Sequence, residues 1–192
     1  MSYTIRPYVS ADRQQLVATV DAVCRESPYM TTAGFTPTPM WEHVLTAPEC
    51  TRHLLLVAVA FEQVVGWCRL FPTARPSRPA WELGIGILGP WRGRGVGTQM
   101  IRTAQAWASR VNGGVITLSV HTGNTGAIRL YDRLGFRPVS TIWPNELQMI
   151  WFPPEDEPGH HAHNQPRAVV RSPEIVGAGW ERRSSEGLAS PR

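Results

Sequence analysis

The fold of this chain is decided by residues 81–98, which read WELGIGILGPWRGRGVGT. Residues 82–88 are apolar enough to form a strand covered on both faces, as a central strand is. The glycine-rich run 92–97 then predicts a tight turn, after which apolar residues recur at helical spacing through Arg110. Such a turn leaves several backbone N–H groups unpaired at a helix N-terminus, beside Arg92 and Arg94. We therefore predict an anion site whose natural ligand is a phosphate.

Two common phosphate-binding patterns do not explain this stretch. A P-loop is excluded because the chain contains no lysine, and that motif places one on the β- and γ-phosphates. The dinucleotide pattern G-x-G-x-x-G is matched by Gly84, Gly86 and Gly89, but these glycines lie within the predicted strand. No Asp or Glu follows Glu82 until Asp132, so no carboxylate is placed to hold a ribose.

A third pattern fits, and a second block of sequence supports it. Arg92, Gly95 and Gly97 match Arg-x-x-Gly-x-Gly, which resembles the pyrophosphate loop of the GNAT N-acetyltransferases. Residues 124–131, NTGAIRLY, resemble the other GNAT signature, Asn-x-x-Ala-x-x-Leu-Tyr, and Gly135-Phe136 closes that block. The two blocks occur in the order that the family has, which makes coincidence a poor explanation.

The resemblance covers residues 1–152 and implies an α/β fold, with helices on both faces of a mixed sheet and splayed central parallel strands. The pattern predicts an edge strand at 3–6 stopped by Pro7, and a helix capped by Ser10 that runs to Glu26. The remaining expected elements are a helix at 40–46, a hairpin of strands at 52–60 and 64–71, the central strand and helix above, a strand at 115–120, a helix ending at Gly135, a strand from 136 through 140, and a last strand at 146–152.

The resemblance also implies how acetyl-CoA binds. In the family, the strand before the turn and the strand after its helix diverge, and the pantetheine arm lies between them like an extra strand. A peptide N–H near Leu88 would then polarise the thioester carbonyl. Many relatives have proline at the position of Gly89, and here Pro90 follows instead, which predicts a looser turn. The residues implied in cofactor binding are Ile87, Leu88, Arg92, Gly93, Arg94, Gly95, Val96, Gly97, Thr98, Asn124, Ala127 and Tyr131.

Two residues are the candidates for catalysis. Tyr131 matches the family tyrosine near the cofactor sulfur, where a phenol can protonate the departing thiolate. The alternative is a core tyrosine whose hydroxyl only finds a hydrogen-bond partner. Glu82 lies on the central strand, where several relatives carry a carboxylate, and can take the proton of the amine directly or through water. The alternative is a strand-end glutamate paired with an arginine.

The function that these features predict is transfer of an acetyl group from acetyl-CoA to a primary amine, by direct attack in a ternary complex. The acceptor stays open among small amines, antibiotic-like polyamines, amino acids and protein N-termini; its candidate walls are Tyr29, Met30, Phe35, Trp41 and Trp143. A catalytically silent acyl-CoA-binding sensor or partner module is the alternative. A nucleic-acid partner is disfavoured because the arginines near the turn lack interleaved aromatic residues. Homodimerisation is left open.

Composition sets further bounds. The net charge is +4, and all 19 basic residues are arginine. The three cysteines show no metal-ligand spacing, and we expect reduced thiols in a cytoplasmic protein without a bound metal. No apolar leader or membrane-spanning run is expected. Residues 153–192 contain six prolines and no periodicity, which predicts a disordered tail in which three histidines (His160, His161, His163) are simply solvated.

Overall fold

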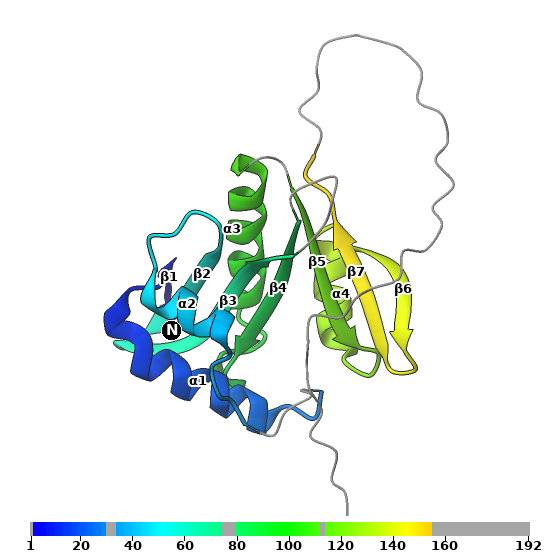
Figure 1. The fold of residues 1–192 in the computed structure, drawn as a ribbon. Helices are drawn as coiled ribbons and strands as arrows, with labels where there is room; N and C mark the ends of the chain where they lie inside the picture. Colours follow the sequence, from blue (N-terminus) through cyan, green and yellow to red (C-terminus); the bar gives the residue numbers. More distant parts are fainter. Residues whose placement is uncertain (1, 30–33, 74–79, 112–113, 155–192) are drawn as a thin grey trace, which may run out of the picture. The chain divides into compact units, whose positions relative to one another are not determined.

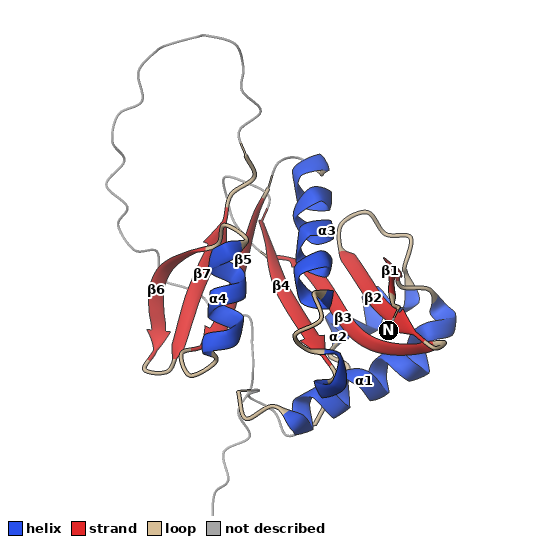
Figure 2. Ribbon diagram, turned by 180° about the vertical axis from the view of Figure 1, so that it is seen from behind, coloured by secondary structure: helices blue, strands red, loops and turns tan. Residues whose placement is uncertain are grey.

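The computed structural model describes residues 2–29, 34–73, 80–111 and 114–154. Within them, a seven-stranded mixed sheet has the order β1-β2-β3-β4-β5-β7-β6, and helices cover both faces (Figures 1 and 2). The predicted α/β fold and the order of its elements are confirmed. The elements are β1 (Thr4–Pro7), α1 (Arg13–Glu26), α2 (Pro39–Thr46), β2 (Leu54–Ala60), β3 (Gln63–Pro72), β4 (Ala80–Ile87), α3 (Val96–Arg110), β5 (Val115–His121), α4 (Thr125–Arg133), β6 (Arg137–Trp143) and β7 (Glu146–Trp151).

Helices α1 and α2 cover one face of the N-terminal half of the sheet. Their apolar residues share a core with β2 and β3 that includes Leu16, Val44, Val57 and Trp67. The predicted cap at Ser10 is wrong. A short 3₁₀ turn occupies Ser10–Asp12 before α1, and the Asp12 carboxylate accepts the Val9 N–H instead.

Helices α3 and α4 cover the opposite face (Figure 2). Their core includes Met100, Ile101 and Ala104 of α3 together with residues of β2 to β5 and β7. Helix α3 approaches the sheet closely at Gly97, where an added Cβ would lie 3.2 Å from Ile87 Cδ1 and 3.3 Å from Leu130 Cδ2. The glycine therefore sets how closely the start of α3 packs against β4 and α4.

Strands β4 and β5 are the one parallel pair of the sheet as described, and they pair over only part of their length. Ala80, Trp81 and Glu82 are in register with residues 115–117, and no pairing follows, although β4 continues to Ile87 and β5 to His121. The strands diverge toward the end of the sheet at which α3 and α4 begin (Figure 1). Unpaired backbone groups on the facing edges of β4 and β5 are therefore open to a ligand.

Some predictions fall outside the described residues. They concern Met30, most of the connection 72–79 and the tail from 155 onward, together with the Trp143 side chain, whose placement is not described. Within the described ranges, no helix combines the length and the apolar character needed to cross a bilayer.

Candidate active site

The glycine-rich turn ends in an open helix N-terminus. Gly93 and Gly95 have φ angles of +71° and +83°, which L side chains rarely adopt, and α3 begins directly after them. Gln99 N–H makes the first backbone bond of the helix, 3.0 Å from the Gly95 carbonyl oxygen. The N–H groups of residues 96–98 therefore precede the intrahelical bonds and lie at the positive end of the helix dipole. This geometry suits a phosphate group.

The Arg92 side chain is bound to other groups of the protein. Its Nε donates to the Ile87 carbonyl at 2.7 Å, and its Nη2 lies 2.9 Å from Glu26 Oε2 at the end of α1. The same carboxylate oxygen accepts the Gly89 N–H at 3.0 Å. A proline at position 89 has no N–H to give, so the departure from the family pattern has a structural use here: it lets Glu26 join α1 to the turn.

Arg94 is also directed toward its own turn. Its Nε donates to the Pro90 carbonyl at 2.8 Å, and its guanidinium carbon lies 5.9 Å from the centre of the Trp91 ring. Both arginines are exposed. In this structure the groups that point outward for an anion are therefore the backbone N–H groups, and the guanidinium groups contribute positive charge nearby.

The backbone of β4 shows which peptide groups face the divergence. Leu88 N–H donates to the Val65 carbonyl at 3.0 Å, so the even-numbered residues of β4 bond to β3. Leu88 N–H is thus engaged and lies beyond the end of the strand. By alternation, the Ile87 N–H and the backbone of Ile85 face β5. The sequence predicted that a peptide N–H near Leu88 polarises the thioester carbonyl, and the candidate for that role is now the Ile87 N–H.

The N-terminus of α4 borders the divergence from the β5 side. Asn124 caps this helix, and its side-chain oxygen accepts the Ala127 N–H at 3.2 Å. The capping bond uses the oxygen and not the amide nitrogen, which keeps its donor character for a ligand. Ala127 packs against the core on this side. Asn124 therefore has a structural role besides the predicted contact with the pantetheine arm.

Tyr131 lies on the α3/α4 side of the sheet and is 8% exposed. Burial raises the pKa of its phenol well above the ordinary value, and the Cys68 thiol adds to the rise. Burial also raises the pKa of Cys68, to about 12. Both groups are therefore protonated near neutral pH, and Tyr131 is available only as a proton donor.

Glu82 lies at the closed end of the divergence, where pairing between β4 and β5 stops. Its Oε1 accepts a hydrogen bond from Arg69 Nη2 at 2.8 Å, so the arginine partner considered from the sequence is present. The Arg69 side chain is 11% exposed and packs over the Phe71 ring, whereas that of Glu82 is 47% exposed. Arg69 thus fixes the carboxylate in position while leaving it accessible to water.

The aromatic residues divide between core and rim. Trp41 is buried and packs edge-on against Phe35 and Trp67, so it is a core residue and not a wall. Tyr29 is exposed and its ring lies 5.3 Å from that of His121, at the far end of β5. This contact joins the segment after α1 to β5. Neither His121 nor Glu26 belongs to a sequence motif. The fold alone places Glu26 against the glycine-rich turn and His121 against Tyr29.

Comparison with known proteins agrees with this geometry. Residues 19–136, more than half of the chain, match the model of the acetyltransferase (GNAT) family. The chain belongs to the GNAT acetyltransferase family. No curated protein sequence matched the chain significantly.

Solved structures of GNAT proteins share the fold. An acetyltransferase of the GNAT family from Streptococcus pneumoniae is 21% identical, with a TM-score of 0.66 over 79% of this chain and 99% of that one. The yncA protein of Salmonella typhimurium, solved with its cofactor acetyl-CoA, is 16% identical, with a TM-score of 0.69 over 84% and 100%. The ribosomal-protein-alanine N-acetyltransferase of Brucella melitensis is 21% identical, with a TM-score of 0.68 over 78% and 99%.

Proposed function

We propose that this GNAT protein transfers an acetyl group from acetyl-CoA to a primary amine in a ternary complex. The observation that carries the proposal is the divergence of β4 and β5 beside the open N-terminus of α3. A pantetheine arm can add to the free backbone edge of β4, and its pyrophosphate then reaches the N–H groups of residues 96–98. A GNAT neighbour solved with acetyl-CoA supports this choice of donor.

The chemistry of the step assigns a role to each group. The neutral amine attacks the thioester carbonyl carbon, whose oxygen develops negative charge and is stabilised by the Ile87 N–H. The C–S bond then breaks, the electron pair leaves with sulfur, and the Tyr131 hydroxyl stabilises the thiolate with a hydrogen bond until the thiolate takes up a proton from solvent on release. The proton lost by the amine goes to Glu82, directly or through water.

The two candidate catalytic side chains lie on opposite faces of the sheet. Tyr131 packs in the core under α3 and α4, whereas Glu82 pairs with Arg69, which stacks on Phe71 within the α1/α2 side. An amine that enters from the α1/α2 side would therefore meet the carboxylate first, with the leaving sulfur toward the tyrosine. This separation of base and acid suits direct attack without a covalent enzyme intermediate.

A panel of amines with acetyl-CoA and a thiol-release readout tests the function. The panel should include small amines, aminoglycoside-like polyamines, amino acids and peptides with free N-termini, because the acceptor is open among these classes. Turnover with any amine supports the enzyme. Binding of acetyl-CoA without turnover across the panel would instead favour a silent acyl-CoA-binding module.

A further inference from the structure

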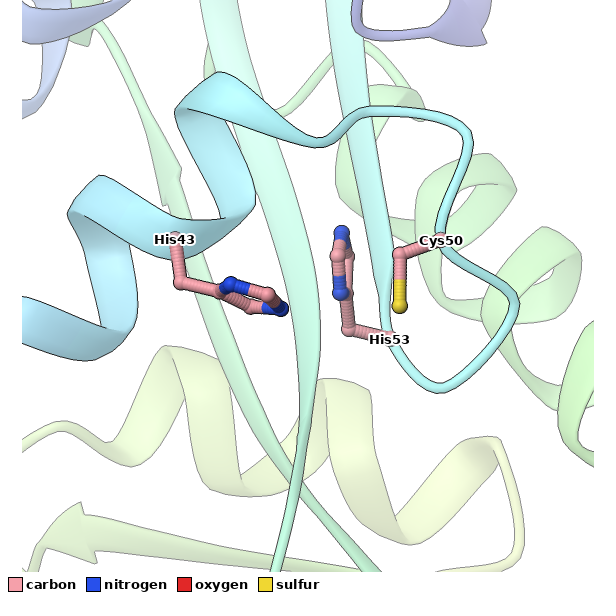
Figure 3. Close-up of side chains that lie close together, drawn as sticks. All are labelled: His43, Cys50 and His53. Atoms are coloured by element: carbon pink, nitrogen blue, oxygen red, sulfur yellow. The ribbon is translucent and has the colours of Figure 1, made fainter.

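Three side chains with metal-binding atoms gather where α2 leads into β2. His43 comes from α2, Cys50 from the connecting loop, and His53 from the residue before β2. One ligand atom from each lies within 4.8 Å of the others, and Figure 3 shows both imidazole rings and the thiol together. None of these residues takes part in the acetyl-transfer site described above.

The burial of His53 needs an explanation. This residue is 5% exposed, and its Nε2 has no hydrogen-bond partner among the described residues. A buried polar atom without a partner costs free energy, and native proteins rarely retain one without a reason. Its ring is also within contact of the His43 ring, with 5.9 Å between centres and planes 74° apart. Two imidazoles and a thiol thus lie together beside a buried nitrogen that has no hydrogen-bond partner within the described part of the chain.

The local electrostatics favour the forms that coordinate metals. Burial lowers the pKa of His53, and the nearby His43 and Arg52 lower it further, so the neutral imidazole dominates near neutral pH. Hydrogen bonds from the backbone and side chain of Arg52 lower the pKa of the Cys50 thiol. Arg52 is a cation and would compete for the thiolate, but its side chain is exposed and can turn away into solvent.

We propose that His43, Cys50 and His53 bind one divalent transition-metal ion of the Zn²⁺ class. Two imidazoles and one thiolate form a borderline-soft donor set, which suits Zn²⁺ and not Mg²⁺ or Ca²⁺. Zn–N and Zn–S bonds place tetrahedral ligand atoms about 3.3–3.6 Å apart, so the cluster must contract by roughly 1 Å. His43 is exposed and Cys50 lies on a loop, so side-chain rotation can supply this movement. The fourth position stays open to water or an exogenous ligand.

The proposed ion would connect α2 to the start of β2. Its ligands come from a helix, a loop and the residue just before a core strand, so coordination closes a segment of 11 residues, from 43 to 53. An ion that binds the folded form and not the unfolded form raises the stability of the folded form by mass action. Zn²⁺ addition should therefore raise the melting temperature of the native chain.

Cobalt titration of the reduced, full-length protein tests the site, after a chelator has removed bound metal. We expect one equivalent of Co²⁺ to produce a thiolate-to-cobalt charge-transfer band, which Zn²⁺ then abolishes by displacement. Cys50→Ser should lose this band while circular dichroism stays native. His43→Asn, at an exposed position, should weaken binding by at least about 10²-fold, since even outer-shell changes cost up to that amount.

A control addresses the three histidines of the tail, which can bind the same probe. A variant with His160, His161 and His163 replaced by asparagine should keep the band and the affinity of the native protein. The proposal is overturned if the native chain gives no charge-transfer band, if Cys50→Ser retains it, if His43→Asn binds as the native chain does, or if the tail variant loses it.

Discussion

At the scale of single residues, the surroundings of Tyr131 determine what its hydroxyl can do. The ring is buried against Phe136, 5.7 Å between ring centres, and the raised pKa keeps the phenol protonated over the whole range in which the enzyme can be assayed. A group that never ionises in that range cannot act as a base. It can still donate a hydrogen bond to the departing thiolate, although its pKa, above the pKa of about 8.5 of a thiol, makes complete transfer of the proton unfavourable.

Tyr131→Phe should lower kcat by about 10²–10⁴-fold with little change in the affinity for acetyl-CoA. The change removes one oxygen and keeps the packed ring. The loss should be smaller with an acyl donor whose leaving thiol is more acidic, because that thiolate needs the hydrogen bond less. Steady-state kinetics with calorimetry checks both quantities. A variant with native kcat would reduce Tyr131 to a core residue.

Asp12 offers a residue-scale prediction about stability. Arg6 donates two hydrogen bonds to its carboxylate, at 2.6 and 2.8 Å, and the Val9 N–H donates a third at 3.0 Å. The bonds from Arg6 are the main cause of the lowered pKa of Asp12, and the bond from Val9 adds to it. The stabilisation is therefore complete above the unfolded-state pKa of about 3.9 and is lost as pH falls through the lower, folded-state pKa.

Asp12→Asn should therefore cost about 1–2 kcal/mol of unfolding free energy at pH 7, and nearly nothing once Asp12 is protonated at low pH. The cost stays modest because the Arg6 side chain is 37% exposed and solvent screens the pair. Denaturant unfolding across a pH series measures it. Glu42→Gln is the matched control: its pair with Arg13 is exposed on both sides and should contribute far less at any pH.

At the scale of elements, the start of α3 combines a backbone requirement with a binding one. Gly95 has φ +83° and is followed by the helix whose N–H groups face outward. A Cβ there would lie 3.7 Å from the Tyr3 hydroxyl, so the protein itself leaves room for it. The cost of substitution in the free protein is therefore backbone strain of roughly 1–2 kcal/mol, and any larger effect on CoA must come from obstruction of the ligand.

Gly95→Ala should weaken CoA binding at least tenfold, about 1.4 kcal/mol, while the protein stays folded. Gly135→Ala is a control with the same strain, because Gly135 also has φ +83° and a Cβ there meets Trp151 at an ordinary 3.5 Å. Gly135 follows the C-terminus of α4, far along the chain from the anion turn. Calorimetry on both variants separates strain from obstruction. Equal affinity for CoA in the two would remove the phosphate assignment.

The same scale shows what the sequence could predict. The sequence pattern located every α-helix and strand of residues 4–151, although not the 3₁₀ turns at Ser10–Asp12 and Gly89–Trp91, because most of these elements have an apolar face, and glycine marked the start of α3. The ends were less certain: β1 includes Pro7, since an edge strand has one side on which no N–H is required. The link from Glu26 to Gly89 and Arg92 joins residues more than 60 positions apart, and no local pattern reports such a contact.

The cluster of His43, Cys50 and His53 was missed for a related reason. The spacing H-x₆-C-x₂-H matches no common zinc motif, so the cysteines alone gave no signal. One ligand lies in a helix and another at the start of a strand, and only the packing of α2 against the sheet brings them together. The two acetyltransferase motifs could be found because the turn and the helix that we propose as the acetyl-CoA site are each local in sequence.

At the scale of the whole molecule, the described core is complete before the chain reaches its last 40 residues. The buried apolar clusters on the two faces of the sheet draw their members from residues 3–151. The last strand along the chain, β7, ends at Trp151. Composition changes at Pro153, where proline and charged residues replace the alternating apolar pattern. The proposed acetyl-transfer groups all lie between residues 82 and 131.

Truncation after Pro154 should therefore leave the melting temperature and the turnover of acetyl-CoA nearly unchanged, because no residue of the described core or of the proposed site is removed. Thermal unfolding and thiol release, measured side by side on the full chain and the truncated one, check this. A second truncation after Gln148 is the contrasting variant: it deletes half of β7, including the buried Met149 and Trp151, and should not yield a folded protein. A drop of many degrees after the first truncation would show that residues beyond 154 pack on the domain, and a selective loss of turnover would place them at the acceptor.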